Sequence, residues 1–276
     1  MNKLIELGKK HNIDIEIFKE KNNSTDISTL NNKVKLFQIT NVTSYIIKAI
    51  KNNRCVKIVT ENIKNTDEII NTLEEMFNTS DNKNSNRLCS GNIKNKVKKH
   101  EKIDYTKVTE DLLSLNELKN KYSCIKTIET EFSHAEIGKL ITNELNNCNM
   151  EDETYLNSYG ASITVEKNNQ TRVLYIGFYT KEYNFNEFKE YLLKRIENLL
   201  IKIDSISLAT NKYKVLLTNN VVESILSTFS TSFQSKGIYL NESVLSDKLN
   251  KKIFSDKITI IEDSPNGILN SNFDSE

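Results

Sequence analysis

Residues 25–40 read TDISTLNNKVKLFQIT, and this stretch sets the fold class of the chain. Apolar and polar residues alternate on both sides of the Asn31-Asn32 pair. Alternation is the period of a half-buried strand, and asparagines are common in tight turns. Residues 25–40 are therefore predicted to form a β-hairpin.

The segments around this hairpin have patterns of the same kind. A short helix is predicted over 4–11 and a separate strand over 13–17, where every second residue is isoleucine. A second hairpin is expected over 45–59, with its turn at 51–53. From Thr66 the apolar spacing changes to three and four, which predicts a helix over 66–77.

The middle of the chain begins with a segment rich in Asn, Ser and Lys. Residues 78–103 are predicted to be a loop or linker, and its basic run from Lys94 to Lys102 contains no aromatic residue. Beyond it we expect a helix over 107–121. Four strands should follow, over 124–132, 135–143, 155–156 and 162–165.

The string RVLYIGFY at 172–179 is apolar enough to predict a strand buried on both faces. A helix over 185–203 follows, with Asn184 and Glu187 as its N-cap pattern. Strands are expected over 213–217 and 257–261, and between them a helix over 221–235 that ends at Gly237 as a C-cap.

These elements predict an α+β fold. Residues 1–205 are expected to form an N-terminal domain of antiparallel sheets with packed helices. Residues 206–276 are expected to be the incomplete start of a C-terminal, mainly-β domain with helices.

Composition excludes several classes of function. The 276 residues carry a formal net charge of only +1, which gives no field to attract nucleic acid or a membrane surface. The four cysteines are far apart in sequence, which favours free thiols in a reducing compartment. No run of about 18 apolar residues is present, and the N-terminus has no signal-peptide core. A soluble, cytoplasmic protein is predicted.

No complete catalytic motif is found. The three histidines form no H-E-x-x-H pattern, and no glycine-rich phosphate-binding or nucleophile motif is present. His134-Ala135-Glu136 matches a deaminase H-x-E but lacks its P-C-x-x-C partner, so His134 is interpreted as a polar residue at a strand end. The acidic turn at 262–265 could bind a cation, although a plain surface turn is favoured.

One face of the predicted helix over 221–235 consists of hydroxyl side chains. These residues can pack closely against a neighbour, or they can form a groove wall or interface that hydrogen-bonds an extended peptide. Both interpretations remain open. The candidate residues are Ser227, Thr228, Ser230 and Thr231, with Ser243 beyond the helix.

Several strings in this order resemble the TldD/PmbA family of zinc metallopeptidases. The matching segments are Asn157-Ser158-Tyr159-Gly160, 162–179, 185–203, Lys212 to Leu217, Ser243-Val244-Leu245, 258–265, Gly267 and Phe273 to Glu276.

The departures from the family pattern point to its PmbA (TldE-like) type. The resemblance implies that TldD-type members carry two zinc-binding histidines and a glutamate on the helix here at 221–235. Between Ser224 and Gly237 this chain has neither residue type. Asn211 and Asn250 stand where the family has glycine. A cysteine zinc ligand of TldD-type members would lie beyond Glu276, so the chain is expected to be truncated, by nature or by an engineered deletion, or to be half of a split protein.

The resemblance implies a subunit without zinc, which pairs with a TldD-like zinc subunit as a heterodimer, or forms a homo-oligomer. Together such subunits would act on unfolded or precursor peptides, as in peptide maturation, and this chain would have no catalytic or metal-binding residues of its own. Two alternatives remain: a peptide-binding module without protease activity, and a degenerate truncated remnant.

Overall fold

The computed structural model describes residues 1–79, 87–95, 102–203, 205–261, 267–268 and 272–273. The chain divides into two compact units. Met1–Ser205 together with Asp263–Glu276 form the first, called here the sheet unit, and Ile206–Glu262 form the second. Among the described residues, no helix is long and apolar enough to cross a membrane.

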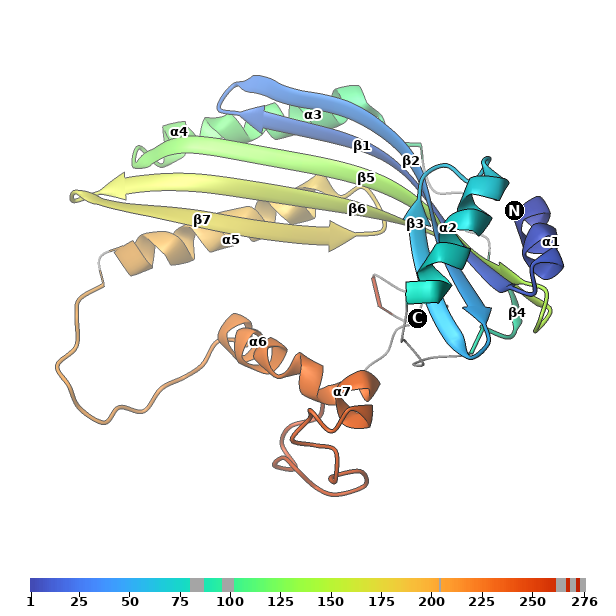
Figure 1. The fold of residues 1–276 in the computed structure, drawn as a ribbon. Helices are drawn as coiled ribbons and strands as arrows, with labels where there is room; N and C mark the ends of the chain where they lie inside the picture. Colours follow the sequence, from blue (N-terminus) through green and yellow to red (C-terminus); the bar gives the residue numbers. More distant parts are fainter. Residues whose placement is uncertain (80–86, 96–101, 204, 262–266, 269–271, 274–276) are drawn as a thin grey trace. The chain divides into compact units, whose positions relative to one another are not determined.

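A single seven-stranded sheet forms the sheet unit (Figure 1). The strand order is β3-β2-β1-β5-β6-β4, and β7 also pairs with β6. All pairs are antiparallel except β4 with β6. The strands are β1 (Asp14–Leu30), β2 (Lys33–Lys51), β3 (Arg54–Thr60), β4 (Asn92–Asn95), β5 (Ile125–Asn143), β6 (Cys148–Lys167) and β7 (Gln170–Thr180).

The predicted hairpin over 25–40 is confirmed, with its turn at Asn31-Asn32. Its strands are much longer than the alternation indicated. The predicted strand at 13–17 and the first half of the hairpin are one strand, β1, because the polar segment between them pairs with β2 on one side and β5 on the other. Paired backbone groups hold such a segment extended whatever its side chains.

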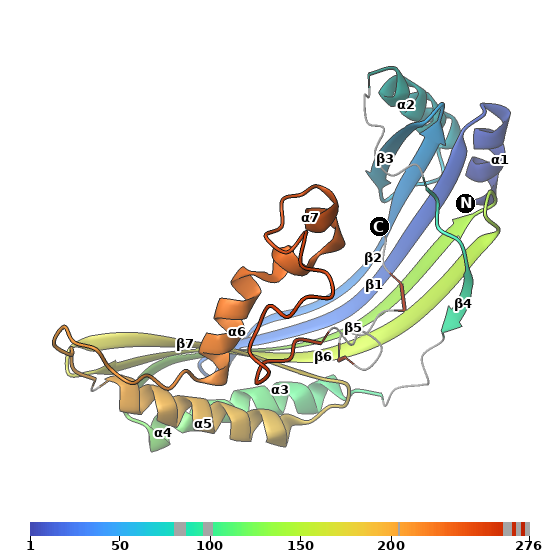
Figure 2. The same ribbon diagram turned by 90° about the horizontal axis from the view of Figure 1, so that it is seen from below.

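The same merging occurs in β5 and β6. The strands predicted over 124–132 and 135–143 are the single strand β5, and those near 155 and 162 lie within β6. As Figure 2 shows, the long strands bend along their length, so one sheet reaches both groups of helices.

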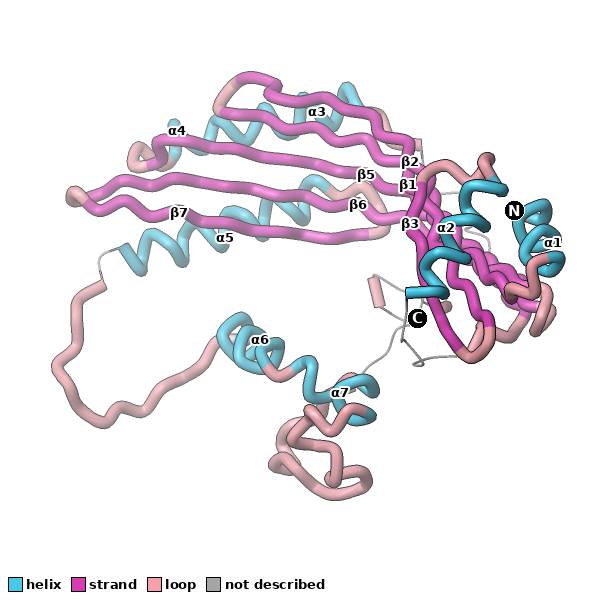
Figure 3. The backbone as a smooth tube through the Cα atoms, viewed as in Figure 1, coloured by secondary structure: helices cyan, strands magenta, loops and turns pink. Residues whose placement is uncertain are grey.

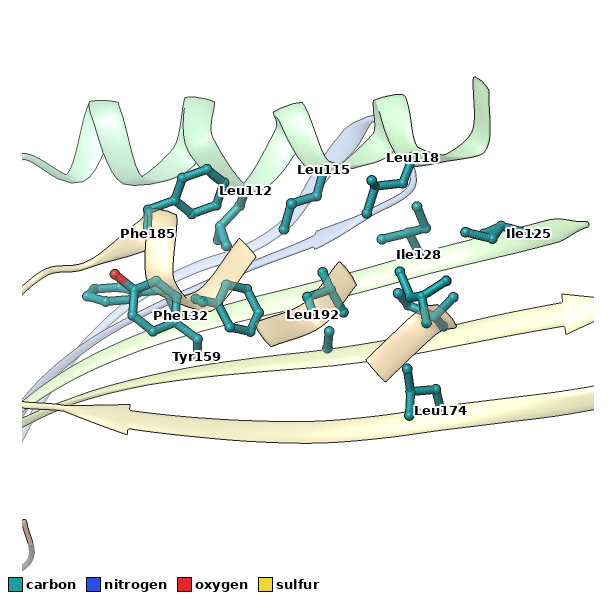
Figure 4. Packing of buried hydrophobic residues seen from close by; sticks show 14 of the residues in the cluster. Leu112, Leu115, Leu118, Ile125, Ile128, Phe132, Tyr159, Leu174, Phe185 and Leu192 are labelled. Carbon is teal, nitrogen blue, oxygen red and sulfur yellow. The ribbon is translucent and has the colours of Figure 1, made fainter. Parts of the chain in front are cut away.

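Two hydrophobic cores lie on the sheet. One joins the β1–β2–β3 end to α1 (Asn2–Lys10) and α2 (Thr66–Thr79), through residues such as Leu4, Ile17 and Leu73. The other packs the opposite end against α3 (Tyr105–Ser114), η1 (Leu115–Glu117), α4 (Leu118–Lys121) and α5 (Phe185–Ile203). Figure 4 shows this second core, in which Leu112, Leu192 and other apolar side chains meet between the helices and the strands.

Both cores lie on the same face of the sheet. Ile17 belongs to the first core and Ile27 to the second, and the two residues are ten positions apart on the unbroken strand β1. Because side chains alternate in direction along a strand, residues an even number apart share a face. A third, smaller cluster of Phe18, Ile141, Cys148 and Met150 lies on the opposite face.

Two predictions for the sheet unit were wrong in part. The strand at 172–179, β7, is buried on one face only, because the helices cover the face that carries Leu174, while Tyr175 on the other face remains 74% exposed. The predicted linker at 78–103 contains the strand β4, held by pairing with β6 at Asn149 to Asp152. The middle of the basic run, at 96–101, lies outside the described residues.

The second unit contains α6 (Asn219–Thr228), η2 (Ser230–Phe233) and α7 (Ser235–Tyr239). Figure 3 shows it as helix and loop, in contrast to the strands of the sheet unit. The strands predicted over 213–217 and 257–261 are not formed, because a strand needs a paired neighbour and none is described for them. Gly237 lies inside α7 and is not a C-cap, and the acidic turn at 262–265 lies outside the described residues.

Candidate functional site

A band of polar side chains crosses the helix-covered face of the sheet between the two cores. The strand registers place Thr25, His134 and Asn157 in one cross-strand row. Asn23, Glu136 and Tyr155 form the next row. The three residues of the first row are buried, which is unusual for polar side chains without partners. We call these six residues the polar band.

His134 and Asn157 are the centre of this band. His134 Nδ1 lies 2.7 Å from Asn157 Oδ1, while the amide nitrogen of Asn157 donates to the carbonyl oxygen of Lys181 at 3.0 Å. Because the amide nitrogen is used in this way, its oxygen faces the imidazole, and Nδ1 of His134 is the donor. Nε2 then points toward Glu136, whose Oε1 lies 3.9 Å away.

His134 was predicted to lie at a strand end, and this was wrong: it lies in the middle of β5. The partner that holds it, Asn157, is the first residue of the Asn-Ser-x-Gly string. The sequence did hold one signal for this site: Asn157 interrupts a series of apolar residues at every second position. A buried asparagine in such a series needs a hydrogen-bond partner. The sequence alone does not reveal which partner it has.

Lys181, just after β7, binds β6 beside the polar band. Its ammonium donates to the Tyr155 carbonyl at 2.6 Å and to Thr154 Oγ1 at 2.9 Å, and it lies 5.3 Å from the centre of the Tyr155 ring. Burial lowers the pKa of Lys181, and the nearby negative charge of Asp152 opposes that shift. The lysine thus stabilises β6 between its pairings with β4 and β7.

The other residues of the Asn-Ser-x-Gly string have packing roles. Tyr159 is 2% exposed, stacks on Phe188 with ring centres 4.8 Å apart, and accepts the Asn184 backbone N–H at 3.2 Å. Burial raises the pKa of its hydroxyl. Asn184 and Glu187 bond to each other as the predicted N-cap of α5. The string therefore joins β6 to the start of α5.

The hydroxyl residues predicted as a groove lie in the second unit and differ in what they bond. Ser227 and Thr228 donate to the carbonyls of Glu223 and Ser224 one turn earlier in α6. Ser243 donates to the carbonyl of Ser232 at 2.7 Å. Ser230 and Thr231 are exposed in η2, and within the described chain their hydroxyls have no hydrogen-bond partner.

Zinc does not fit the donors on this helix. Zinc in proteins takes imidazole, thiolate and carboxylate ligands, and α6 and η2 offer only hydroxyl and apolar side chains from Ser224 onward. Across the described part of the chain, no three His, Cys, Asp or Glu side chains are grouped to hold a metal ion.

A short segment near the end of the chain contacts the sheet unit. Asp152 accepts the Asn272 backbone N–H and its side-chain amide, each at 2.9 Å, and the Asn95 amide at 2.7 Å. Phe273 packs against the cluster that contains Phe18 and Met150. Phe273, the first residue of the last string in the family resemblance, thus packs against the sheet.

Comparison with known proteins supports the family resemblance. Residues 210–276 match the model of the PmbA/TldA metallopeptidase C-terminal domain. None of the curated proteins matches the chain.

Solved structures share the fold at low sequence identity. A protein from Thermotoga maritima, described as a candidate modulator of DNA gyrase, has a TM-score of 0.71 and 15% identity over 90% of this chain and 58% of its own. One from Bacteroides thetaiotaomicron with the same description has 0.74 and 16%, over 92% and 62%. TldE from Thermococcus kodakarensis has 0.55 and 13%, over 72% and 47%.

This chain therefore spans about three-fifths of the length of the first two structures. The predicted α+β fold is confirmed by these structures, and the match over residues 210–276 supports the resemblance to the TldD/PmbA family.

Proposed function

We propose that this chain is a PmbA/TldE-like subunit of a TldD/PmbA-type metallopeptidase complex, acting in the cytoplasm on unfolded or precursor peptides without catalysing cleavage itself. One observation carries the proposal. The segment that matches the metallopeptidase C-terminal domain presents hydroxyls along α6 and η2, where a zinc-binding subunit needs imidazole and carboxylate ligands.

In such a complex the zinc ion on a TldD-like partner would polarise the scissile carbonyl and activate water. The residues of this chain would bind and orient the peptide. Ser230 and Thr231 suit this role, because their exposed hydroxyls are not used by the second unit's own carbonyls. A hydroxyl can donate to a peptide carbonyl and accept from a peptide N–H, whatever the peptide's sequence.

The test is a peptidase assay with the purified chain, a TldD-like zinc subunit, and their mixture, each with and without added zinc. We expect no cleavage by this chain alone and faster cleavage by the mixture than by the TldD-like subunit alone. Zinc-dependent cleavage by this chain alone would overturn the proposal. So would a mixture no faster than the TldD-like subunit.

A pair of double variants tests the peptide-binding role. Ser230→Ala with Thr231→Val should raise the KM of the mixture severalfold and leave kcat unchanged, since a uniform binding contribution is lost. The matched control is Ser227→Ala with Thr228→Val, because those hydroxyls are bonded within α6. Equal KM increases in both double variants would argue against a specific role of Ser230 and Thr231.

A further inference from the structure

The first half of β2 is an unpaired sheet edge. β3 pairs with β2 only from Tyr45 to Lys51, so Lys33–Ser44 has β1 on one side and, among the described residues, no strand on the other. Its backbone forms no hydrogen bond to any other described segment on that side. Such an edge presents a row of free N–H and C=O groups that can pair with another chain.

The residues of this edge favour pairing. From Leu36 to Ser44 the sequence LFQITNVTS has no charge, no proline and no glycine. Edge strands are normally protected by such residues or by a bulge. The register with β1 shifts once, at Lys35, and is continuous from Leu36 to Ser44. Large apolar side chains are exposed on both faces of the edge: Leu36 (43%), Phe37 (52%), Ile39 (65%) and Val42 (39%).

The edge is charged only at its beginning. Lys33 and Lys35 lie near the turn, and Lys35 is paired with Glu129. The opposite edge of the sheet is different. β7 carries Arg172 within its strand, has a glycine at 177, and is followed by Lys181. Both edges are uncharged along their centres, and β2 is the one whose uncharged stretch contains no glycine, a residue that weakens a strand.

A second copy of the same edge is a fitting partner. Residues that lie opposite each other in an antiparallel pair point to the same face of the sheet. If the two copies are related by a two-fold axis perpendicular to the sheet, the axis must therefore lie between the two copies of a single residue. With the axis at Ile39, the two copies of Ile39 are opposite each other, Leu36 is opposite Val42, and Gln38 is opposite Thr40. Apolar residues meet apolar ones, and the amide meets the hydroxyl.

Charge also supports this pairing. In the antiparallel arrangement Lys35 of one copy is opposite Thr43 of the other, and no two lysines are opposed. Shifting the axis to Gln38 places Lys35 opposite Asn41, which is also uncharged. A parallel arrangement would instead bring the lysines of the two copies together, and like charges directly opposite destabilise a strand pair.

We infer that Lys33–Ser44 of β2 is a self-association interface, at which two copies of this chain pair antiparallel near Gln38 and Ile39 to form one continuous sheet. This inference is independent of the proposed peptidase function and concerns the chain by itself.

The test measures the molar mass of the full chain by sedimentation equilibrium over a wide range of concentration. We expect a reversible dimer. Ile39→Lys should raise the dissociation constant at least about tenfold, because it places an ammonium in the pairing edge. The matched control is Tyr175→Lys on β7, a side chain of similar exposure at the other edge. It should leave the dissociation constant unchanged.

Circular dichroism of each variant separates loss of association from loss of folding, and hydrogen exchange gives a second readout. In the wild-type chain, amides of Lys33–Ser44 should gain protection as concentration rises. A wild-type chain that stays monomeric at every concentration would overturn the inference. So would an Ile39→Lys variant that dimerises as tightly as the wild type, or weakening by Tyr175→Lys alone.

Discussion

At the scale of single residues, Gly8 shows how tertiary contacts can reverse a local preference. Gly8 lies in α1, where alanine would ordinarily be favoured by about 1 kcal/mol. A Cβ placed there would lie 2.6 Å from Ile15 Cδ1 and 3.0 Å from the Ile13 carbonyl oxygen. Ile15 is buried and the carbonyl is backbone, so neither can move away easily.

We therefore predict that Gly8→Ala destabilises the sheet unit by about 1 kcal/mol, since overpacking costs roughly 1–3 kcal/mol and outweighs the gain in helix propensity. Urea unfolding followed by circular dichroism measures this. Gly138→Ala is the control, because no atom lies within 4 Å of its added Cβ. A Gly8→Ala variant more stable than the wild type would show that α1 shifts to make room.

The polar band also belongs to this scale. The sequence contains His134, Glu136 and Asn157 in recognisable strings, but their meeting depends on the register of β5 with β6. Register is set by pairing along whole strands, so neither string predicts it alone. The sequence identified the candidate hydroxyl residues. It could not show that Ser227 and Thr228 donate to carbonyls of their own helix.

At the scale of elements, alternation and helical spacing were sufficient to predict the hairpins and every long helix of the sheet unit. Strand length was not predictable in the same way. Segments such as Lys19–Ser24 have no apolar alternation and are extended because both neighbours hold them. The opposite error occurred at 213–217, where a good strand pattern has no described strand to pair with.

The contact between Asp152 of β6 and Asn272 predicts a pH dependence. Burial raises the pKa of Asp152, but the Asn272 backbone N–H, the Asn95 and Asn272 amides and the charge of Lys139 together lower it below its ordinary value. A pKa that folding lowers contributes stability above the unfolded value, about 3.9. That contribution is lost as the pH falls through the folded value.

We expect Asp152→Asn to reduce the free energy of unfolding at pH 7 by about 1–3 kcal/mol, because the asparagine has one accepting oxygen where Asp152 uses two, and its NH2 group cannot accept a hydrogen bond. The variant should also lose less stability than the wild type when the pH is lowered from about 5 to about 3, a range that brackets the unfolded-state pKa of an aspartate. Urea unfolding at each pH measures both effects. Asp247→Asn, at an exposed carboxylate, is the control. Parallel pH profiles for wild type and Asp152→Asn would contradict this assignment.

At the scale of the whole molecule, the two units differ in how much they bury. Among the residues that the structure describes, all the buried hydrophobic ones lie between Leu4 and Ile203, and no residue of α6 is buried. Stability within a protein follows buried contacts, so segments that bury little open first. The α+β class was predictable from the order of patterns, whereas this unequal burial required the structure.

Limited trypsin digestion of the full chain should therefore cut first at lysines of the second unit, such as Lys212, Lys214 and Lys257. The part of the sheet unit from Met1 to Ser205 should resist longer, as a fragment that ends near Ser205. Mass spectrometry over time gives the order of cleavage, and digestion in urea, where both units are unfolded, is the control. Cuts within β1 or β5 that precede those in the second unit would contradict the prediction.

In the described part of the chain, nine asparagines have a left-handed backbone: Asn12, Asn31, Asn52, Asn53, Asn147, Asn168, Asn169, Asn241 and Asn250. Among non-glycine residues, asparagine adopts this geometry at the lowest cost. Asn250, where the family resemblance implies a glycine, has the positive φ that glycine would also allow. The chain has only seven glycines, and asparagine supplies the left-handed geometry at most of its tight turns. A comparison that looks for glycine at each turn would therefore understate how closely this backbone follows the solved structures that share its fold.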